Sequence, residues 1–245
     1  PSQQTIDNGL LIWNALYTDL SMTAMVPSWH YAQIPSSQKD RNMSDSNSED
    51  ASGLRERLEA QGVEYALAGY VDMHGVSKSK VVPIAHLDRM MAGSELCTGA
   101  ALDGVPQDVS EEEVSPRPDS QSMMILPWKR NVAWFASDLW CAGQPFEPCN
   151  RTIFKRVLAQ AADMGYRFNF GIEPEFFLLR ETADGYVPIG PRDDLAKPAY
   201  DVRSTLDSFD MLEHIVRELN GLGYDVYSYD HEDGNGQFEI DFTYS

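Results

Sequence analysis

Hydrophobic residues follow helical spacing first and strand spacing next along residues 52–84. Leu54 and Leu58 lie on one helical face, and Gly62 is expected to end that helix. The following stretch, VEYALAGYVDMHGVSKSKVVPI, predicts two strands with a tight turn between them. Short strands and proline-rich loops come next, so we expect a small β-rich domain over residues 52–147.

A second domain is expected over residues 148–245. RTIFKRVLAQAADMGY predicts an amphipathic helix, RFNFGIEPEFFLLR (167–180) a strand, and a longer helix is expected at about 205–221. YDVYSYDHEDGNGQFEIDFTY then predicts a strand, a turn and a strand. This alternation favours an α/β or α+β fold. Because Ser245 directly follows the last of these strands, we expect the chain to stop inside this domain.

Residues 1–51 have a different composition. They are rich in Ser, Gln, Asn and Asp, and the stretch SSQKDRNMSDSNSED offers almost nothing to bury. We expect a disordered or non-native N-terminal extension here. Met43 precedes the first helix, and a natural start at this residue, with residues 1–42 untranslated, is a hypothesis that the intact mass of the native protein would test.

Composition and charge exclude several classes of function. With 19 Lys and Arg against 38 Asp and Glu, the formal net charge is −19, which argues against binding nucleic acid or an anionic membrane through a basic face. The three cysteines have no CxxC spacing, so neither a disulfide framework nor a zinc site is indicated. The sequence contains no signal-peptide pattern and no apolar run of about 18 residues. We therefore expect a cytoplasmic protein.

The candidate chemistry lies in carboxylates within the predicted strands of the second domain. Residues two positions apart in a strand share a face, so Glu173 and Glu175 would point the same way. Glu239 lies in another strand, and Glu232 comes just before the turn that leads to it. If these strands are neighbours, the four carboxylates repel one another unless a cation lies between them. Oxygen ligands alone suit Mg²⁺ or Mn²⁺ better than zinc.

Other readings of these acids remain open. Any one glutamate could lie on the solvated face of a half-buried strand, although this explains a set of four less well. The spacing of DHEDGNG does not fit an EF-hand loop. A pair of carboxylates could also serve a glycosidase, but that chemistry does not require four.

Two motifs resemble those of glutamine synthetase. EPEFF (173–177) and DHEDGNGQFEIDF (230–242) follow the family patterns E-P-E-F and H-H-E-x-x-x-G-Q-x-E, with Asp230 in place of the first histidine. YVDMHGVSKSKVVP (70–83) resembles the strand pair of the family's N-terminal domain, with its Asp-x-x-Gly signature. The resemblance covers about residues 54–245. It is nearest to the type III or GlnT-like branch, which includes proteins similar to γ-glutamylmethylamide synthetase.

The resemblance implies an α+β fold. A small β-grasp-like N-terminal domain would precede the first part of a catalytic domain, built as a curved antiparallel sheet with flanking helices. It also implies that Glu175, Glu232 and Glu239 hold one metal ion and that Glu173 helps to hold a second. Two more residues receive roles from the family: Asp72 would reach into a neighbouring subunit's site to bind and deprotonate ammonium, and Tyr200 would line the ammonium pocket.

The implied function is an ATP-dependent ligase that makes a γ-glutamyl amide from glutamate through γ-glutamyl phosphate. The nitrogen donor would be ammonia or a small amine such as methylamine, between which the residues do not decide. Two Mg²⁺ or Mn²⁺ ions per site, ATP as co-substrate and a homo-oligomeric ring with active sites between subunits are expected. The nucleotide motif, the second metal's histidine and the phosphate-binding arginines would lie beyond Ser245, so this chain alone is expected to be inactive.

Two alternatives to the ligase stay open. A non-catalytic relative could serve as a metabolite sensor or as a structural ring protein. An unrelated metal-dependent hydrolase would be favoured if ATP had no effect on turnover.

Overall fold

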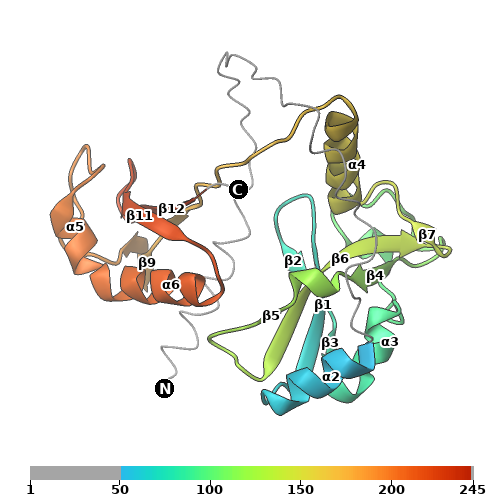
Figure 1. The fold of residues 1–245 in the computed structure, drawn as a ribbon. Helices are drawn as coiled ribbons and strands as arrows, with labels where there is room; N and C mark the ends of the chain where they lie inside the picture. The colour runs from blue at the N-terminus through green and yellow to red at the C-terminus, as the bar shows by residue number, and fades with distance from the viewer. Residues whose placement is uncertain (1–50, 244–245) are drawn as a thin grey trace.

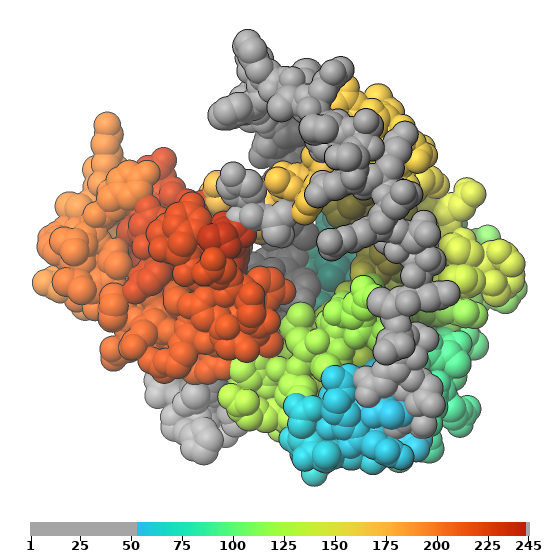
Figure 2. Space-filling model, in the orientation of Figure 1, coloured from blue at the N-terminus to red at the C-terminus, as the bar shows by residue number. Residues whose placement is uncertain are grey.

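The computed structural model describes residues 51–243, and from residue 53 onward their side chains. The expectations of a disordered extension and of a start at Met43 lie outside the described residues. The described chain has a mixed α+β fold. Figure 1 shows two groups of elements, joined by a segment without regular secondary structure between Met164 and Pro174. Figure 2 shows the same division, with the orange and red atoms of the second group gathered on one side of the molecule.

The first group is built on one sheet. Its central strands β1 (Tyr65–Val71) and β6 (Val132–Cys141) run parallel, and Tyr65 pairs with Val132. The short strands beside β1, antiparallel to it, are β2 (Ser77–Lys78) and β3 (Val81–Pro83). The strands antiparallel to β6 are β4 (Ser115–Pro118), β5 (Met124–Ile125) and β7 (Gln144–Pro145).

Helices cover one face of this sheet. The helices are α2 (Ala51–Ala60) and α3 (Leu87–Met91), with single 3₁₀ turns at Ile84–His86, Gly99–Ala101 and Ser120–Ser122. Leu58 of α2 and Met90 of α3 are fully buried against Ala66 of β1 and Phe135 of β6. The helix predicted from residue 52 is therefore confirmed as α2. Its leucines pack against the apolar face of the sheet.

Helix α4 (Asn150–Asp163) is anchored at its first turn to the sheet of the first group. The side-chain amide of Asn150 donates to the carbonyl oxygen of Val71 at 2.7 Å. The guanidinium of Arg151 donates to Asp138 at 2.8 Å and to Asp119 at 2.7 Å. Beyond this turn the helix has a largely exposed apolar face, since Ala161 is its one buried residue among those described.

The strand expected at residues 167–180 forms only in part. Regular pairing begins at β8 (Glu175–Phe177), and the segment from Arg167 to Pro174 is not a strand. A strand requires a partner for its backbone groups, and none of the described strands pairs with this segment. Its apolar side chains Phe168, Phe170 and Ile172 are exposed as a result.

The second group combines two small sheets with two helices. Its first sheet is the hairpin β9 (Leu179–Thr182) and β10 (Gly185–Pro188). Its second sheet is antiparallel in the order β11, β12, β8, with β11 at Val226–His231 and β12 at Gln237–Phe242. The longer helix expected at about 205–221 is two helices, α5 (Val202–Asp207) and α6 (Phe209–Gly221).

The core of the second group is separate from that of the first. Leu212, Ile215 and Leu219 of α6 are buried against Phe238 and Ile240 of β12. No residue of the first group belongs to this cluster within residues 53–243. The packing of α6 against one face of the sheet leaves the opposite face of β12 for polar side chains. In the part of the chain that the structure describes, no helix has the length and hydropathy needed to cross a membrane.

Candidate metal centre

The register of the three-stranded sheet brings acidic residues from different segments together. Glu239 in β12 is paired directly with Asp230 in β11 on one side and with Glu175 in β8 on the other. Residues opposite each other in antiparallel strands have side chains on the same face. Glu232 lies just after β11, and its amide donates to the carbonyl oxygen of Gln237 at 2.9 Å. Carboxylates therefore line the face of the sheet opposite α6.

Three of these acids form a tight group. Carboxylate oxygens of Asp230, Glu232 and Glu239 lie within 4.8 Å of one another, and all three residues are half-buried. Burial raises the pKa of Glu239 to about 8, helped by its hydrogen bond with Glu232 and by the negative charges of Asp241, Glu232 and Glu173. Burial and the charges of Glu232 and Asp241 also raise the pKa of Asp230, although His231 opposes this. The raised pKa values show that negative charge dominates around Asp230 and Glu239.

The donor atoms of this group fit a hard divalent cation. A cation held at about 2.0–2.6 Å from each oxygen allows its ligand oxygens to be up to about 4–5 Å apart, which matches the observed separation of 4.8 Å or less. The three donors are all carboxylate oxygens, the type that Mg²⁺ and Mn²⁺ prefer over nitrogen and sulfur. A bound cation would also relieve the repulsion that raises the pKa of Glu239.

The two glutamates of the EPEFF motif lie at the margin of the group. The carboxylate of Glu175 accepts a hydrogen bond from the side-chain amide of Gln237, whose oxygen in turn accepts from the amide of Gly234 at 2.8 Å. Glu173 lies in the segment before β8, and its charge contributes to the raised pKa of both Glu239 and Tyr227. Both glutamates are exposed, and neither belongs to the tight group.

Asp230 belongs to the tight acidic group but is not among the metal ligands predicted from the sequence. It was treated as a departure from a histidine pattern, whereas the structure puts its carboxylate inside the tight group and leaves Glu175 outside. The signal was available, because Asp230 and Glu232 are two positions apart at the end of one strand and therefore share a face.

The turn between β11 and β12 is fixed by a buried polar network. His231 is fully buried, with Nε2 at 2.8 Å from Oδ2 of Asp193 and Nδ1 at 2.8 Å from the carbonyl oxygen of Glu232. Oδ1 of Asp193 accepts from the side-chain amide of Asn235 at 2.9 Å, and Oδ2 accepts from the amide of Gly236. Burial tends to raise the pKa of Asp193, but these hydrogen bonds outweigh it and hold the pKa below its usual value.

The segment that carries the acidic group is similar to known proteins. Residues 147–245, which contain the whole acidic group, match the family model of the glutamine synthetase catalytic domain. The glutamate–methylamine ligase of Methyloversatilis universalis is 35% identical over 77% of this chain and 43% of its own length. A glutamine synthetase of Rhizobium leguminosarum bv. phaseoli is 36% identical over 75% of this chain and 42% of its own. The chain belongs to the glutamine synthetase family.

Solved structures agree with this assignment. A structure titled GmaS/ADP complex is 33% identical and superposes with a TM-score of 0.72 over 78% of this chain and 44% of that one. A structure titled as a novel glutamine synthase homolog is 18% identical with a TM-score of 0.61, which supports the fold alone. The chain spans less than half the length of these members of the glutamine synthetase family.

Asp72, which the family resemblance assigns to a neighbouring subunit's site, lies in the turn between β1 and β2. Asp72 is only 2% exposed, and its Oδ1 accepts from the amides of His74 at 3.0 Å and Val76 at 2.9 Å. Its Oδ2 lies 3.5 Å from Nζ of Lys78. The carboxylate is thus enclosed by its own turn, which it organises.

Tyr200, the other family residue expected at the site, lies beside the turn. Its amide donates to the carbonyl oxygen of His231 at 2.8 Å, while its side chain is 74% exposed. Its φ of 65° lies in the left-handed region, which is unusual for a residue other than glycine and often marks a functional segment. The backbone of Tyr200 is therefore held next to the acidic group with its ring free to meet another surface.

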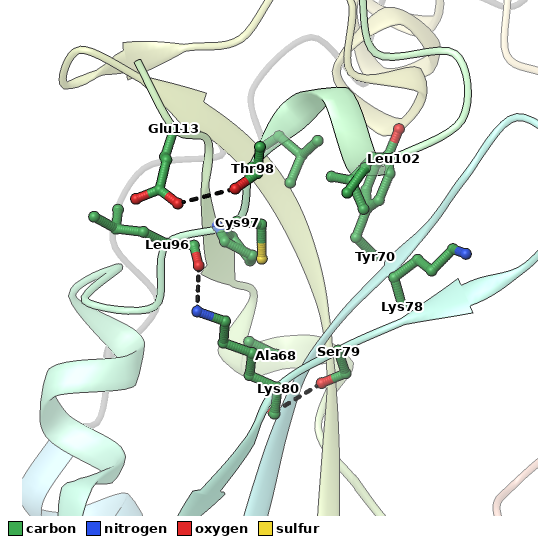
Figure 3. A pocket seen from close by; sticks show the side chains of 13 residues that line it. Ala68, Tyr70, Lys78, Ser79, Lys80, Leu96, Cys97, Thr98, Leu102 and Glu113 are labelled. Atoms are coloured by element: carbon green, nitrogen blue, oxygen red, sulfur yellow. Dashed lines mark hydrogen bonds between the residues drawn. The ribbon is translucent and has the colours of Figure 1, made fainter. Parts of the chain in front are cut away.

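A pocket lies in the first group of elements, and none of the residues that line it belongs to the acidic group of Asp230, Glu232 and Glu239 (Figure 3). Its volume is about 330 Å³. Lys80 donates to the carbonyl oxygen of Leu96, and Thr98 donates to Glu113 at 3.2 Å, so these polar groups satisfy one another. Burial raises the pKa of Tyr70 to about 12, so its phenol stays neutral. Glu113 is the one carboxylate among the residues that line this pocket, whereas three carboxylates meet in the acidic group.

Proposed function

We propose that this chain supplies part of the active site of an ATP-dependent ligase that joins the γ-carboxyl group of glutamate to ammonia or to a small amine. The observation that carries the proposal is the group of Asp230, Glu232 and Glu239, which lies in the segment matched by the catalytic-domain model. One similar relative is named a glutamate–methylamine ligase and another a glutamine synthetase. Their identities of 35% and 36% do not separate the two amines, so the proposal covers both.

The roles follow from the positions of the side chains. Glu232 and Glu239, with Asp230, would hold one divalent cation, Mg²⁺ or Mn²⁺, and Glu175 would approach it from β8. The charge of Glu173 acts on Glu239, and Glu173 would help to hold a second cation. Bound cations would neutralise the phosphoryl oxygens of ATP. Tyr200 would present its exposed ring to the incoming amine.

The reaction needs an activated carboxylate. Because the γ-carboxylate of glutamate is a poor electrophile, one of its oxygens would attack the γ-phosphorus of ATP and expel ADP, which gives γ-glutamyl phosphate. The nitrogen of a neutral amine would then attack the acyl carbon and expel phosphate, while a carboxylate takes the proton that the nitrogen loses.

The architecture is proposed on the same basis. The parallel pairing of β1 with β6 and the helices on one sheet face support a β-grasp-like domain over residues 52–147, followed by the catalytic segment 148–245. We propose that the whole protein is a cytoplasmic ring of identical subunits with sites between them. Three unpaired cysteines fit a reducing compartment.

Mn²⁺ binding tests the proposal directly. The full chain is titrated with Mn²⁺ alone, and free Mn²⁺ is measured by electron paramagnetic resonance. Glu239→Gln is expected to weaken binding at least tenfold, because it removes one charged ligand without changing the size of the side chain. Glu181→Gln makes the same change at an exposed strand position outside the group and should bind as the wild type does. Equal affinity in Glu239→Gln would refute the site.

A further inference from the structure

The most deeply buried charged side chains near the acidic group are Asp193 and His231. Their side chains are 1% and 0% exposed, and Nε2 of His231 lies 2.8 Å from Oδ2 of Asp193. The other ring nitrogen, Nδ1, faces the carbonyl oxygen of Glu232 at 2.8 Å. Both ring nitrogens thus face oxygen atoms.

This pair connects two segments that are distant in the sequence, the loop before α5 and the turn between β11 and β12. Asp193 belongs to the loop before α5 and accepts hydrogen bonds from Asn235 and Gly236 in the turn between β11 and β12. His231 ends β11, and its carbonyl oxygen accepts from the amide of Tyr200. The loop that carries Asp193 and Tyr200 and the turn that follows Glu232 are therefore held together by these two side chains and by the backbone carbonyl of His231.

Stability alone does not explain such a pair. Burying two polar side chains costs free energy that their interaction often only balances, so apolar residues of similar size would serve a core as well. What the pair adds is direction, since each hydrogen bond fixes one backbone or side-chain atom relative to another. The atoms that it fixes are the carbonyl of Glu232, the amide of Gly236 and, through the carbonyl of His231, the amide of Tyr200.

We propose that Asp193 and His231 are positioning residues that couple cation binding at the acidic group to the order of the loop carrying Tyr200. A cation that draws in the carboxylate of Glu232 fixes the backbone of that residue. Through the ring of His231 the constraint reaches Asp193 and the loop. This inference rests on the proposed function, because it takes the acidic group to be a cation site.

Asp193→Asn is the most informative variant, because it keeps the shape of the side chain. In the wild type, Oδ2 accepts from His231 and Gly236, and Oδ1 accepts from Asn235. An asparagine has one oxygen and one NH₂ group, so either orientation directs a donor at a donor. Asp194→Asn is the matched control, since it removes the same charge one residue away at an exposed position.

The experiment uses Mn²⁺ as the probe and two readouts. Mn²⁺ affinity is measured by electron paramagnetic resonance on the full chain. Amide hydrogen exchange of the peptide spanning residues 197–204 is measured with and without Mn²⁺. We expect Mn²⁺ to slow exchange at Tyr200 at least tenfold in the wild type and in Asp194→Asn. In Asp193→Asn the affinity should fall about tenfold, and the effect of Mn²⁺ on the peptide should disappear.

A merely structural pair gives a different result. Asp193→Asn would then exchange faster with and without Mn²⁺ alike and would keep the difference between the two states, which overturns the coupling. If Asp193→Asn does not fold, Asn235→Ala removes one hydrogen bond to Asp193 and leaves the pair in place. A reduced Mn²⁺ effect at Tyr200 in that variant supports the coupling, and an unchanged one overturns it. If the wild type binds no Mn²⁺, the proposed function fails first and the coupling fails with it.

Discussion

Asp230 and Glu239 are directly paired residues of antiparallel strands, and their carboxylates meet in a group whose oxygens lie within 4.8 Å. The pairing places two negative charges on one half-buried face, where water screens them poorly. Burial and the neighbouring negative charges raise the pKa of Glu239 from its usual value of 4.5 to about 8. One strand register thus creates both the candidate cation site and the strain that a cation would relieve.

The stability of the metal-free chain should therefore fall as the pH rises from about 5 to 8. Because the pKa of Glu239 is higher in the folded state than in the unfolded state, the folded state binds this proton more tightly. The stabilisation is complete below the unfolded pKa and is lost as the pH passes the folded one. Thermal melting in the presence of EDTA measures this, and Glu239→Gln should have a flatter profile. Parallel pH profiles for the two proteins would contradict the assignment.

Local periodicity was enough to predict much of the fold. Leu54 and Leu58 indicated α2 correctly, and the alternation around Phe238 indicated β12, because both signals concern residues a few positions apart. Asp230 was not predicted as part of the site, because the register of β11 and β12 places it opposite Glu239 and local sequence spacing does not give that register. The segment around Phe170 has the pattern of a strand, but a pattern does not supply the partner that a strand needs.

The case of Asp72 shows that one motif permits two readings. Asp-x-x-Gly was interpreted from the family resemblance as an ammonium-binding acid. An aspartate three residues before a glycine is also the ordinary signature of a turn whose amides bond to the carboxylate, and this is what the structure contains. The burial of Asp72 that comes with this turn could not be read from the motif.

Asp72→Ala should accordingly reduce stability and leave Mn²⁺ binding intact. The substitution removes the acceptor for the amides of His74 and Val76, and leaving such groups unpaired costs about 1–3 kcal/mol. Asp72→Asn retains an oxygen that can accept both bonds and should lose less. Urea unfolding gives the stability, and a Mn²⁺ titration provides the second measurement. Weaker Mn²⁺ binding by a folded Asp72→Ala variant would restore a role for Asp72 at the site.

The two separate cores predict that the two groups of elements unfold independently. Phe238→Ala opens a cavity beside α6 and should cost the second group about 3–5 kcal/mol. Leu58→Ala should cost the first group about 2–5 kcal/mol. Hydrogen exchange resolved by peptide distinguishes the groups, and each variant should accelerate exchange in its own group only. Equal acceleration in both groups would show one cooperative unit and would contradict the separation of the two cores.

The last prediction concerns the aromatic cluster of Phe154, Phe168 and Phe170, which joins α4 to the segment before β8. The ring of Phe170 lies 5.6 Å from that of Phe154 and 6.0 Å from that of Phe168, and the three side chains are 39–54% exposed. Contiguous apolar surface of this kind binds apolar partners, so the isolated chain should bind the dye ANS and associate with itself.

Phe170→Asp tests this cluster at its centre. The charge should reduce ANS fluorescence and shift sedimentation toward the monomer. It should leave circular dichroism unchanged, because the segment around Phe170 has no regular structure to lose. Tyr186→Asp is the matched control, since Tyr186 is 71% exposed on β10 and lies outside the cluster. Equal ANS binding by Phe170→Asp and the wild type would show that the cluster is not the surface that drives association. A reduction confined to Phe170→Asp would identify it as that surface.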